Sequence, residues 1–246
     1  MASGGGERHL DWDGCFNVRD LGGLPAAGGA KTARGALVRA DSLSRLSAAG
    51  WQALLDHGVR TVIDLRNPHE RKEAPDLAAR PAAIETVLAP LDGTEDRGFW
   101  RSIEQTPEFG TPIYYRAHLM RKPQLVAGAV KAIVDAPPGG VAFHCVGGRD
   151  RTGELAMVTL ALAGVPAAQI AADYELSAER QRGLWQALGQ PDQDTEIQAY
   201  LAERGTTAGE VIETTLASLD LEATLAAGGL GAQDLAALRS RLLGSS

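Results

Sequence analysis

Apolar positions along the chain follow two periods, one typical of helices and one of buried strands. Over residues 44–58 large apolar side chains recur at helical spacing, with Ser44 or Ser47 as the N-cap and Gly58 as the closing residue. A short β-branched run, TVIDL at 61–65, comes next and ends in a polar turn. Such a run after a helix predicts a buried parallel strand.

The alternation of helix and strand continues along the chain. PPGG turns the chain into VAFHC at 141–145, which predicts a second central strand, and residues 84–88 predict a further strand. Helical periodicity over 112–135 is interrupted at Pro123, so we expect two helices there. Beyond residue 151 every periodic segment is helical, and we expect helices at 151–163, 166–181, 194–204, 207–218 and 231–243.

Three segments lack a long period. Residues 16–43 mix short apolar pieces with glycine pairs, which predicts short strands or hairpins. Residues 66–110 are rich in proline, glycine and charge and predict a long surface excursion of the kind that often forms a lid. Glycine-rich residues 1–8 predict a flexible tail, which leaves 9–246 as a single domain.

Together these elements predict an α/β fold. We expect a central, mostly parallel sheet flanked by helices, with the leucine- and alanine-rich C-terminal helices packed as a layer on it. No internal repeat and no convincing linker divides the 246 residues.

Composition limits the partners more than the fold. The formal net charge is −7, whereas general affinity for nucleic acid or an anionic membrane needs a basic surface. No run approaches the roughly 18 apolar residues of a membrane span, and the first residues lack the order of a secretory signal. We therefore expect a cytoplasmic protein without a nucleic-acid partner or stable membrane insertion. The oligomeric state stays open.

The two cysteines, Cys15 and Cys145, are too few for a disulfide framework. No CxxC or HExxH spacing suggests a metal site, so we expect neither a metal nor another cofactor. Cys15 is expected to be an inert buried cysteine, with a redox partnership to Cys145 as the alternative.

Cys145 lies in a candidate binding loop. VAFHC ends a strand, VGGRDR forms a loop, and a helix begins near Arg151, and this edge of an open α/β sheet usually binds ligands. Gly147 and Gly148 allow positive φ, so the amides from Val146 onward form a nest for an oxyanion together with the helix start. The same donors and nearby cations favour an ionised, nucleophilic thiolate.

Side chains around the loop complete a phosphoryl-transfer site. Arg151, in a Cys-x5-Arg pattern, can hold two phosphate oxygens bidentately. Thr152 offers a hydroxyl to the leaving sulfur, and His144 is expected to order the loop. A leaving alcohol or phenol also needs a proton from a carboxylic acid. Asp150 is the first candidate, and the alternatives are Asp64, Asp92 and Asp96.

The segment HCVGGRDRTG resembles the phosphatase loop of the protein tyrosine phosphatase superfamily, in the atypical bacterial and fungal branch whose loop reads HCxxGKDRTG. The likeness continues in NVRDLGG (17–23), in residues 33–50, in TVIDLRNPHER (61–71) and in residues 223–243. The resemblance therefore covers nearly the whole chain from about residue 10.

This resemblance implies metal-free, two-step hydrolysis of phosphate monoesters on a tyrosine-phosphatase-like fold. Cys145 would attack phosphorus, Arg151 and the loop amides would hold the phosphoryl group, and Asp150 would protonate the leaving group and then activate water. Asp64 and Arg66 are expected to support the site. Arg149 replaces the family's loop lysine. The positive charge is kept while its reach and geometry change, so the resemblance implies phosphotyrosine activity more strongly than phosphoinositide activity.

Three functions remain open at this point. The first is a phosphatase acting chiefly on phosphotyrosine, with dual specificity for phosphoserine and phosphothreonine. The second is a phosphoinositide phosphatase, and the third is an inactive phosphate-binding module. All three share a phosphorylated protein or phosphoinositide as the partner.

Overall fold

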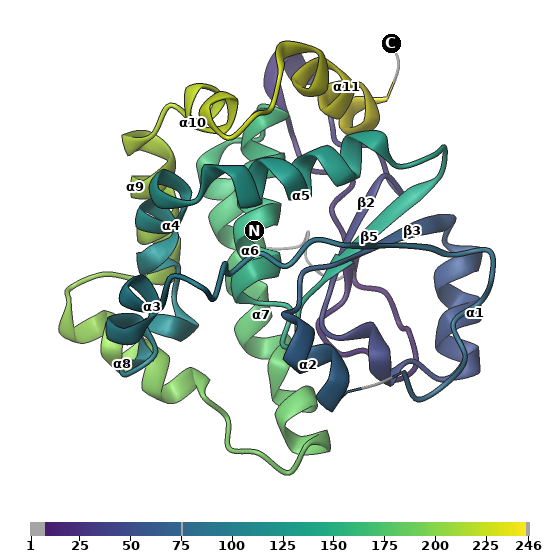
Figure 1. Ribbon diagram of the computed structural model, residues 1–246, viewed down its shortest axis with the longest axis horizontal. Helices are drawn as coiled ribbons and strands as arrows, with labels where there is room; N and C mark the ends of the chain where they lie inside the picture. The colour runs from purple at the N-terminus through teal and green to yellow at the C-terminus, as the bar shows by residue number, and fades with distance from the viewer. Residues whose placement is uncertain (1–7, 75, 245–246) are drawn as a thin grey trace.

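A five-stranded sheet forms the centre of the molecule (Figure 1). The structure is a computed structural model and describes residues 8–74 and 76–244. Across the sheet the strands are β1 (Arg19–Asp20), β2 (Leu37–Ala40), β5 (Gly140–His144), β3 (Val59–Asp64) and β4 (Glu85–Leu88). All neighbours are parallel except β1, which is antiparallel to β2. The predicted α/β class with a mostly parallel central sheet is confirmed.

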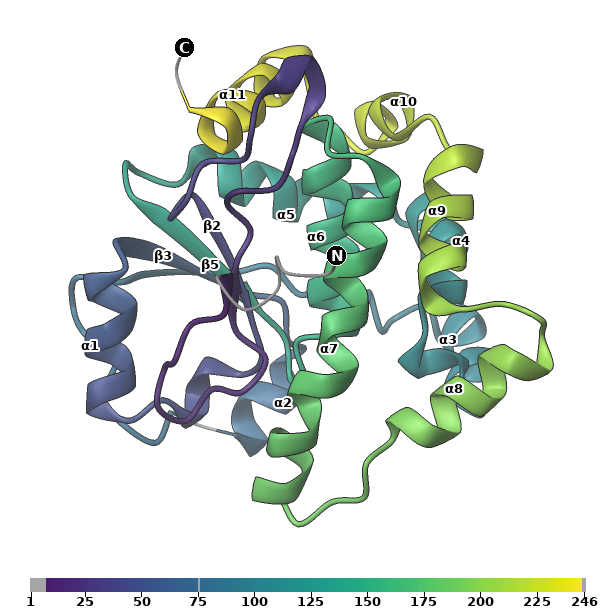
Figure 2. The ribbon, with the colours of Figure 1, turned by 180° about the vertical axis from the view of Figure 1, so that it is seen from behind.

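Helices cover both faces of the sheet. On one face lies α1 (Ala48–Asp56), and most of the others form a thick layer on the opposite face, where α6 and α7 run side by side (Figures 1 and 2). The remaining helices are α2 (Pro68–Glu73), α3 (Arg97–Ile103), α4 (Tyr115–Arg121), α5 (Pro123–Asp135), α6 (Asp150–Leu162), α7 (Ala167–Ala187), α8 (Asp194–Glu203), α9 (Ala208–Ser218), α10 (Leu221–Ala227) and α11 (Ala232–Leu243), with 3-10 turns at Ala27–Gly29, Leu43–Arg45, Pro107–Gly110 and Pro112–Tyr114.

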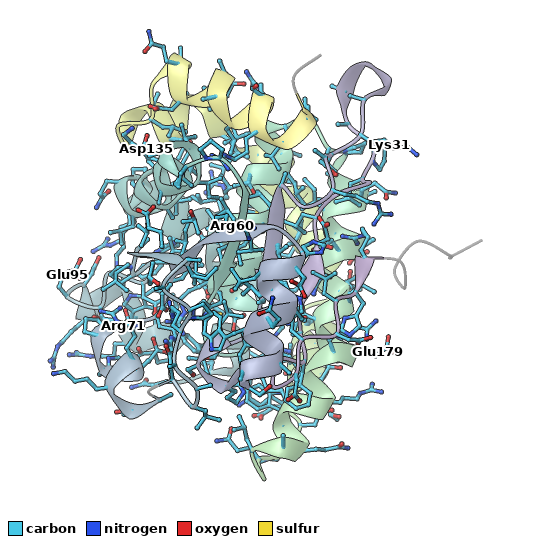
Figure 3. The ribbon with its side chains drawn as sticks, turned by 90° about the vertical axis from the view of Figure 1, so that its right-hand side faces the viewer. Lys31, Arg60, Arg71, Glu95, Asp135 and Glu179 are labelled. Carbon is cyan, nitrogen blue, oxygen red and sulfur yellow. The ribbon has the colours of Figure 1, made fainter. Side chains whose placement is uncertain are left out.

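Strand periodicity sorts the core into two clusters. Successive side chains of a strand point to opposite faces, so Val62 and Ala142 pack towards α1 whereas Ile63 and Phe143 pack towards the thick helical layer. The continuous apolar runs read from the sequence are therefore strands buried on both faces. Charged side chains such as Lys31 and Glu179 extend from the margin of the molecule (Figure 3).

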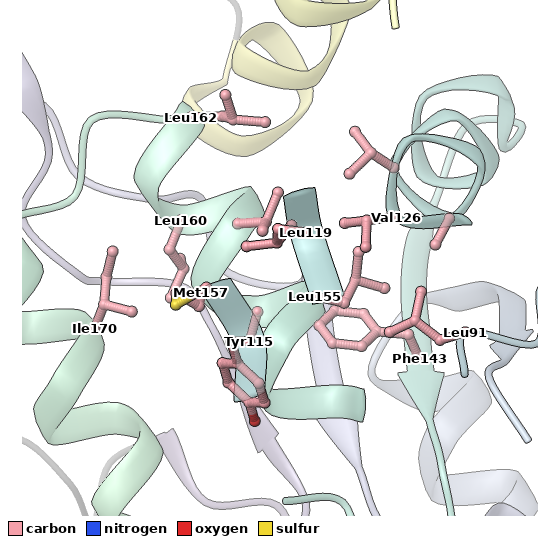
Figure 4. Packing of buried hydrophobic residues seen from close by; sticks show 14 of the residues in the cluster. Leu91, Tyr115, Leu119, Val126, Phe143, Leu155, Met157, Leu160, Leu162 and Ile170 are labelled. Carbon is pink, nitrogen blue, oxygen red and sulfur yellow. The ribbon is translucent and has the colours of Figure 1, made fainter. Parts of the chain in front are cut away.

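Helix α6 is the most deeply buried helix of the layer. Nearly every one of its residues is buried, so it is enclosed on all sides and not amphipathic. Leu155 of this helix lies beside Phe143 of β5 and Leu91 in the close view of the core (Figure 4). The start of α6 is thus fixed by packing, and so is the loop that leads into it.

Local signals in the sequence explain most helix boundaries. Ser47 caps α1 by accepting from Gly50 N at 3.1 Å, and Pro123 separates α4 from α5 as expected. Three helices, α2, α3 and α10, were not predicted, because each has only six or seven residues. Helix α7 continues to Ala187, beyond the predicted end at residue 181.

The N-terminal part of the chain is more ordered than predicted. Residues 1–7 of the expected tail lie outside the described residues, but Arg8 is buried and its Nη1 contacts Asp173 Oδ1 at 2.7 Å. Residues 16–43 supply the short pair β1 and β2, as expected, but β2 then joins the parallel sheet beside β5.

Within the described ranges, no helix is long and apolar enough to cross a membrane.

Strand register brings four chain segments to one edge. Ala40 pairs with His144, His144 with Asp64, and Asp64 with Leu88, so β2, β5, β3 and β4 end at the same level. Loops that follow these ends lie at the carboxyl edge, where α/β sheets usually hold their sites.

The C-terminal layer should contribute directly to stability. Leu238 of α11 is fully buried in the larger core cluster, so Leu238→Ala should lower the free energy of unfolding by about 2–5 kcal/mol through a cavity. Urea unfolding followed by circular dichroism measures this loss. Ser240→Ala on the exposed face of the same helix is the control. Equal stability of the two variants would contradict the packing described.

Candidate active site

The segment from Cys145 to Arg151 connects β5 to α6 as a tight loop. Gly148 adopts φ 70°, and a Cβ there would lie 2.7 Å from both Ala40 O and Asp41 N. Gly147 has no positive φ, contrary to expectation; a Cβ there would instead lie 2.5 Å from Gln181 Nε2. Gly148 is needed for its conformation and its close approach to backbone, whereas a Cβ at Gly147 would require the end of the Gln181 side chain to move.

Carbonyl oxygens of the loop accept hydrogen bonds from groups of other segments of the chain. The donors are Ser42 N to Val146 O (2.9 Å), Asn17 Nδ2 and Gln181 Nε2 to Gly147 O (3.1 and 2.7 Å), and Arg39 Nη2 to Gly148 O (2.8 Å). Because a trans peptide directs its N–H opposite to its C=O, the following amides point towards the loop's interior. Gly148 N accordingly donates to Cys145 Sγ at 3.3 Å.

Arg39 connects the loop to a buried charged cluster. Its Nη1 contacts Asp173 Oδ2 at 2.8 Å, and Arg8 and Arg19 contact the same carboxylate at 2.7 and 3.1 Å. Burial and the neighbouring charge of Arg39 lower the pKa of Arg19 to about 9. Burial works against ionisation of Asp173, but the three guanidinium groups outweigh it and lower its pKa. Three cations thus share one anion behind the loop.

Arg151 is held on the pocket wall by two carboxylates. Its Nη1 and Nη2 donate to Glu70 Oε2 and Oε1 at 2.5 and 2.7 Å, and Nη1 lies 3.2 Å from Asp92 Oδ2. Glu70 is fixed in turn by Asn67 N, which donates to Oε2 at 2.7 Å, and Asn67 Nδ2 donates to Asp92 Oδ2 at 2.7 Å. The Nε edge of Arg151 donates to no residue that the structure describes and remains for a ligand.

Asp150 lies in the pocket wall next to both loop arginines. Burial raises its pKa to about 6, although the charges of Arg149 and Arg151 oppose the shift. Its Oδ1 accepts no hydrogen bond from a described residue. The side chain of Arg149 is buried and lies 3.8 Å from Asp194 Oδ1. Asp150 is thus a carboxyl group that carries a proton for part of the time near neutral pH.

The other predicted acids differ in placement. Asp92 lines the pocket but is already in contact with Asn67 and Arg151. Asp96 caps α3 and pairs with Arg121 Nε at 2.5 Å, outside the lining of the pocket. Asp64 also lies outside that lining.

The predicted supporting residues lie behind the loop. Asp64 and Arg66 form a paired contact (3.0 and 2.8 Å), and Arg66 Nη1 donates to Ser42 Oγ at 3.1 Å. Burial opposes ionisation of Asp64, but hydrogen bonds from Arg66 outweigh it and lower its pKa. Burial lowers the pKa of His144 to about 4, so this ring is neutral, and its Nδ1 donates to Cys145 O at 3.1 Å. Thr152 Oγ1 donates to Ala40 O at 3.4 Å, and no hydrogen bond joins it to Cys145 Sγ.

The second cysteine is chemically quiet. Cys15 Sγ lies 2.6 Å from Asp41 Oδ1, and burial together with the charge of Asp41 raises the pKa of its thiol well above the usual value. A protonated thiol is a poor nucleophile. This geometry favours the inert interpretation of Cys15.

A cavity of about 380 Å³ opens over Cys145. Its volume falls in the range of small-molecule and side-chain binding sites. One wall comes from the 66–110 excursion and contains Glu104, Phe109 and Gly110; another wall comes from α7 and α8 and contains Trp185 and Glu196. The aromatic residues Trp100, Tyr114 and Tyr115 are buried and pack together, and Tyr114 also lines the cavity.

The sequence as a whole matches a known family. A family model described as the tyrosine phosphatase family matches residues 10–244. The chain belongs to this family. The resemblance of the loop to a bacterial branch is confirmed by two bacterial relatives.

A tyrosine-protein phosphatase of Nostoc commune is 36% identical over 148 residues, which are 60% of this chain and 50% of that protein. A Cupriavidus necator protein, provisionally named a tyrosine-protein phosphatase, is 33% identical over 186 residues, which are 73% of this chain and 66% of that protein. The chain therefore spans about half to two thirds of the length of these relatives.

Among solved structures, this family member resembles P. aeruginosa TpbA in complex with phosphotyrosine. The TM-score is 0.36 at 17% identity, and the match covers 79% of this chain and 86% of that chain. This similarity is too weak to inform the site.

Several residues of this tyrosine phosphatase family member were not identified from sequence. Glu70 lies three residues after Asn67 and follows a proline, which is the spacing of a capping box, and that signal could have marked it. Arg39, Asp173 and Gln181 carry no local signal, because their roles depend on helix α7 packing against β2 and the loop.

Arg39 should control the shape of the binding loop. Arg39→Lys keeps the charge but cannot bridge Asp173 and Gly148 O with a planar fork. Loss of one hydrogen bond from a charged donor predicts orthovanadate affinity about ten- to a hundredfold weaker, measured by calorimetry. Arg60→Lys is the matched control. Among the described residues, the Arg60 guanidinium donates only to the carbonyls of Leu55 and Val59. Unchanged affinity in a folded Arg39→Lys protein would contradict this role.

Proposed function

We propose that the chain is a metal-independent protein tyrosine phosphatase that hydrolyses phosphotyrosine through a phosphocysteine intermediate. The observation that supports this most is the arrangement of Cys145 Sγ, which accepts from Gly148 N at 3.3 Å and shares one cavity with Arg151. A thiol and an inward-facing amide nest at one point suit attack on a bound tetrahedral oxyanion. Among the described residues no group of acidic, histidine or cysteine side chains could hold a metal ion.

In the first step the thiolate of Cys145 attacks phosphorus. An S–P bond forms while the bond from phosphorus to the tyrosine oxygen breaks. The amides of residues 146–151 and the guanidinium of Arg151 stabilise the charge on the equatorial oxygens. Asp150 gives its proton to the leaving phenolate, and a pKa of about 6 leaves about one such group in ten protonated at pH 7.

In the second step water attacks the phosphocysteine. Asp150, now a carboxylate, takes a proton from that water as its oxygen bonds to phosphorus. The S–P bond breaks, phosphate leaves, and the thiolate of Cys145 is restored. The cycle consumes one water molecule, restores both side chains and uses no cofactor.

A wider substrate range belongs to the same proposal. Phosphoserine and phosphothreonine esters have more basic leaving groups and depend more on the acid, so they should react more slowly than phosphotyrosine. Phosphoinositide hydrolysis is the second candidate, favoured by Arg149, whose buried guanidinium lines the cavity beside Arg151. An inactive binding module would keep the nest but not turn over.

Replacement of the nucleophile distinguishes a phosphatase from an inactive binding module. The protein should hydrolyse p-nitrophenyl phosphate in EDTA, and Cys145→Ser should abolish turnover while it retains phosphate or vanadate binding. Steady-state assays and calorimetry measure the two properties. Cys15→Ser, which removes the other thiol, should keep its activity. Undiminished hydrolysis by Cys145→Ser would refute the phosphocysteine step, and an inactive parent protein would favour the binding module.

The acid is identified by dependence on the leaving group. Above about pH 6 the protonated fraction of Asp150 falls, so kcat/KM for phenyl phosphate should fall with it, and Asp150→Asn should remove this decline. The variant should lose about 10²- to 10⁴-fold on phenyl phosphate and less on p-nitrophenyl phosphate, whose leaving group needs little protonation.

Two matched variants test the alternatives. Asp92→Asn disturbs Arg151 and should slow both substrates alike, and Asp96→Asn, outside the cavity, should slow neither strongly. A selective loss on phenyl phosphate in Asp92→Asn or Asp96→Asn would transfer the acid role to that residue.

A further inference from the structure

The cavity over Cys145 carries more acidic than basic groups. Its two cations are Arg149 and Arg151, both at the phosphate end. Its acids are Glu70, Asp92, Glu104, Asp150 and Glu196. The lining contains no lysine. Glu70, Asp92 and Asp150 lie beside these arginines, so the exposed Glu104 and Glu196 are the carboxylates that a substrate meets first.

Both arginines are already balanced by carboxylates. Arg151 contacts Glu70 and Asp92, and Arg149 lies 3.8 Å from Asp194. The amide nest and the Nε edge of Arg151 are enough to hold a single phosphoryl group. Both arginines are buried at the phosphate end, so neither presents its charge at the mouth for a second anionic group.

Glu104 and Glu196 form the acidic mouth of the cavity. They come from different walls of the cavity, Glu104 at the end of α3 and Glu196 in the first turn of α8. Both are exposed, and neither forms an ion pair with a described residue. The dipole of α8 stabilises Glu196, which lies in its first turn. Glu104 lies at the C-terminal end of α3, where a carboxylate is unfavourable, so helix stability does not explain Glu104.

Two further groups of the cavity lining also suit a cationic side chain. Gln181 is 3% exposed and lines the cavity, and its Oε1 accepts no hydrogen bond from a described residue. The ring of Trp185 lines the same wall, and aromatic rings attract ammonium and guanidinium groups. An acceptor oxygen and an aromatic ring thus accompany the carboxylates.

We infer that Glu104 and Glu196 select phosphotyrosine peptides in which lysine or arginine flanks the phosphorylated residue. This selectivity rests on the proposed phosphatase function and names its substrate class. The nest binds the phosphoryl group, and the mouth attracts basic flanks and repels acidic ones. A membrane rich in phosphoinositides, whose headgroups carry several negative charges, is repelled by the same mouth.

Three peptides of equal length around one phosphotyrosine, with lysine, glutamine or glutamate flanks, test the inference. At about 20 mM salt we expect the lysine peptide to exceed the glutamate peptide about tenfold in kcat/KM, and about 500 mM salt should reduce the ratio to about twofold. Glu104→Gln combined with Glu196→Gln should reduce the low-salt ratio to a similar extent. Glu213→Gln, an exposed glutamate on α9 outside the cavity lining, should keep it.

Failure of the selectivity is distinguishable from failure of the catalytic proposal. Hydrolysis of p-nitrophenyl phosphate with equal rates on all three peptides would overturn the inference alone. If that hydrolysis is absent, fluorescence anisotropy of the same peptides on the Cys145→Ser protein measures the preference in binding, and a preference for glutamate flanks would overturn it. Faster hydrolysis of vesicles containing phosphatidylinositol phosphates than of the lysine peptide would also overturn it.

Discussion

The outward direction of the loop carbonyls is the constraint on which the site depends. A peptide group cannot turn its N–H into the pocket unless its C=O finds a donor behind the loop. Asn17, Arg39, Ser42 and Gln181 supply those donors from three separate parts of the chain. The anion nest is therefore a product of tertiary packing, and the loop sequence alone would not hold its shape.

Arg39 is the most consequential of these donors, because it is part of a buried ionic cluster. Asp173 offsets only one of the three positive charges around it, so the cluster leaves positive charge behind the loop. Such charge stabilises an anion in front of the loop at distances where burial weakens screening. Removal of Asp173 would leave three buried guanidinium groups without their shared carboxylate, which is costly. One network thus serves both stability and ligand binding.

Sequence predicted most of the architecture and the grouping of residues around Cys145. Periodicity located β3, β5 and most helices, and the loop pattern placed Cys145, Asp150 and Arg151 in one cavity. The contacts that it missed join residues far apart in the sequence. Glu70 reaches Arg151 across 81 positions and Gln181 reaches Gly147 across 34, and these distances along the chain leave no periodic trace.

The contact between Glu70 and Arg151 orients the arginine as well as neutralising it. Glu70 takes both Nη atoms, so a phosphoryl group can approach only the Nε edge or displace the carboxylate. Displacement would leave Glu70 as an unpaired anion beside a bound dianion, which Coulomb repulsion disfavours. The arrangement therefore favours a ligand with one phosphoryl group, bound edge-on between Arg151 and the amides. An acidic mouth adds to the same preference, because further anionic groups on the ligand would meet carboxylates on both walls.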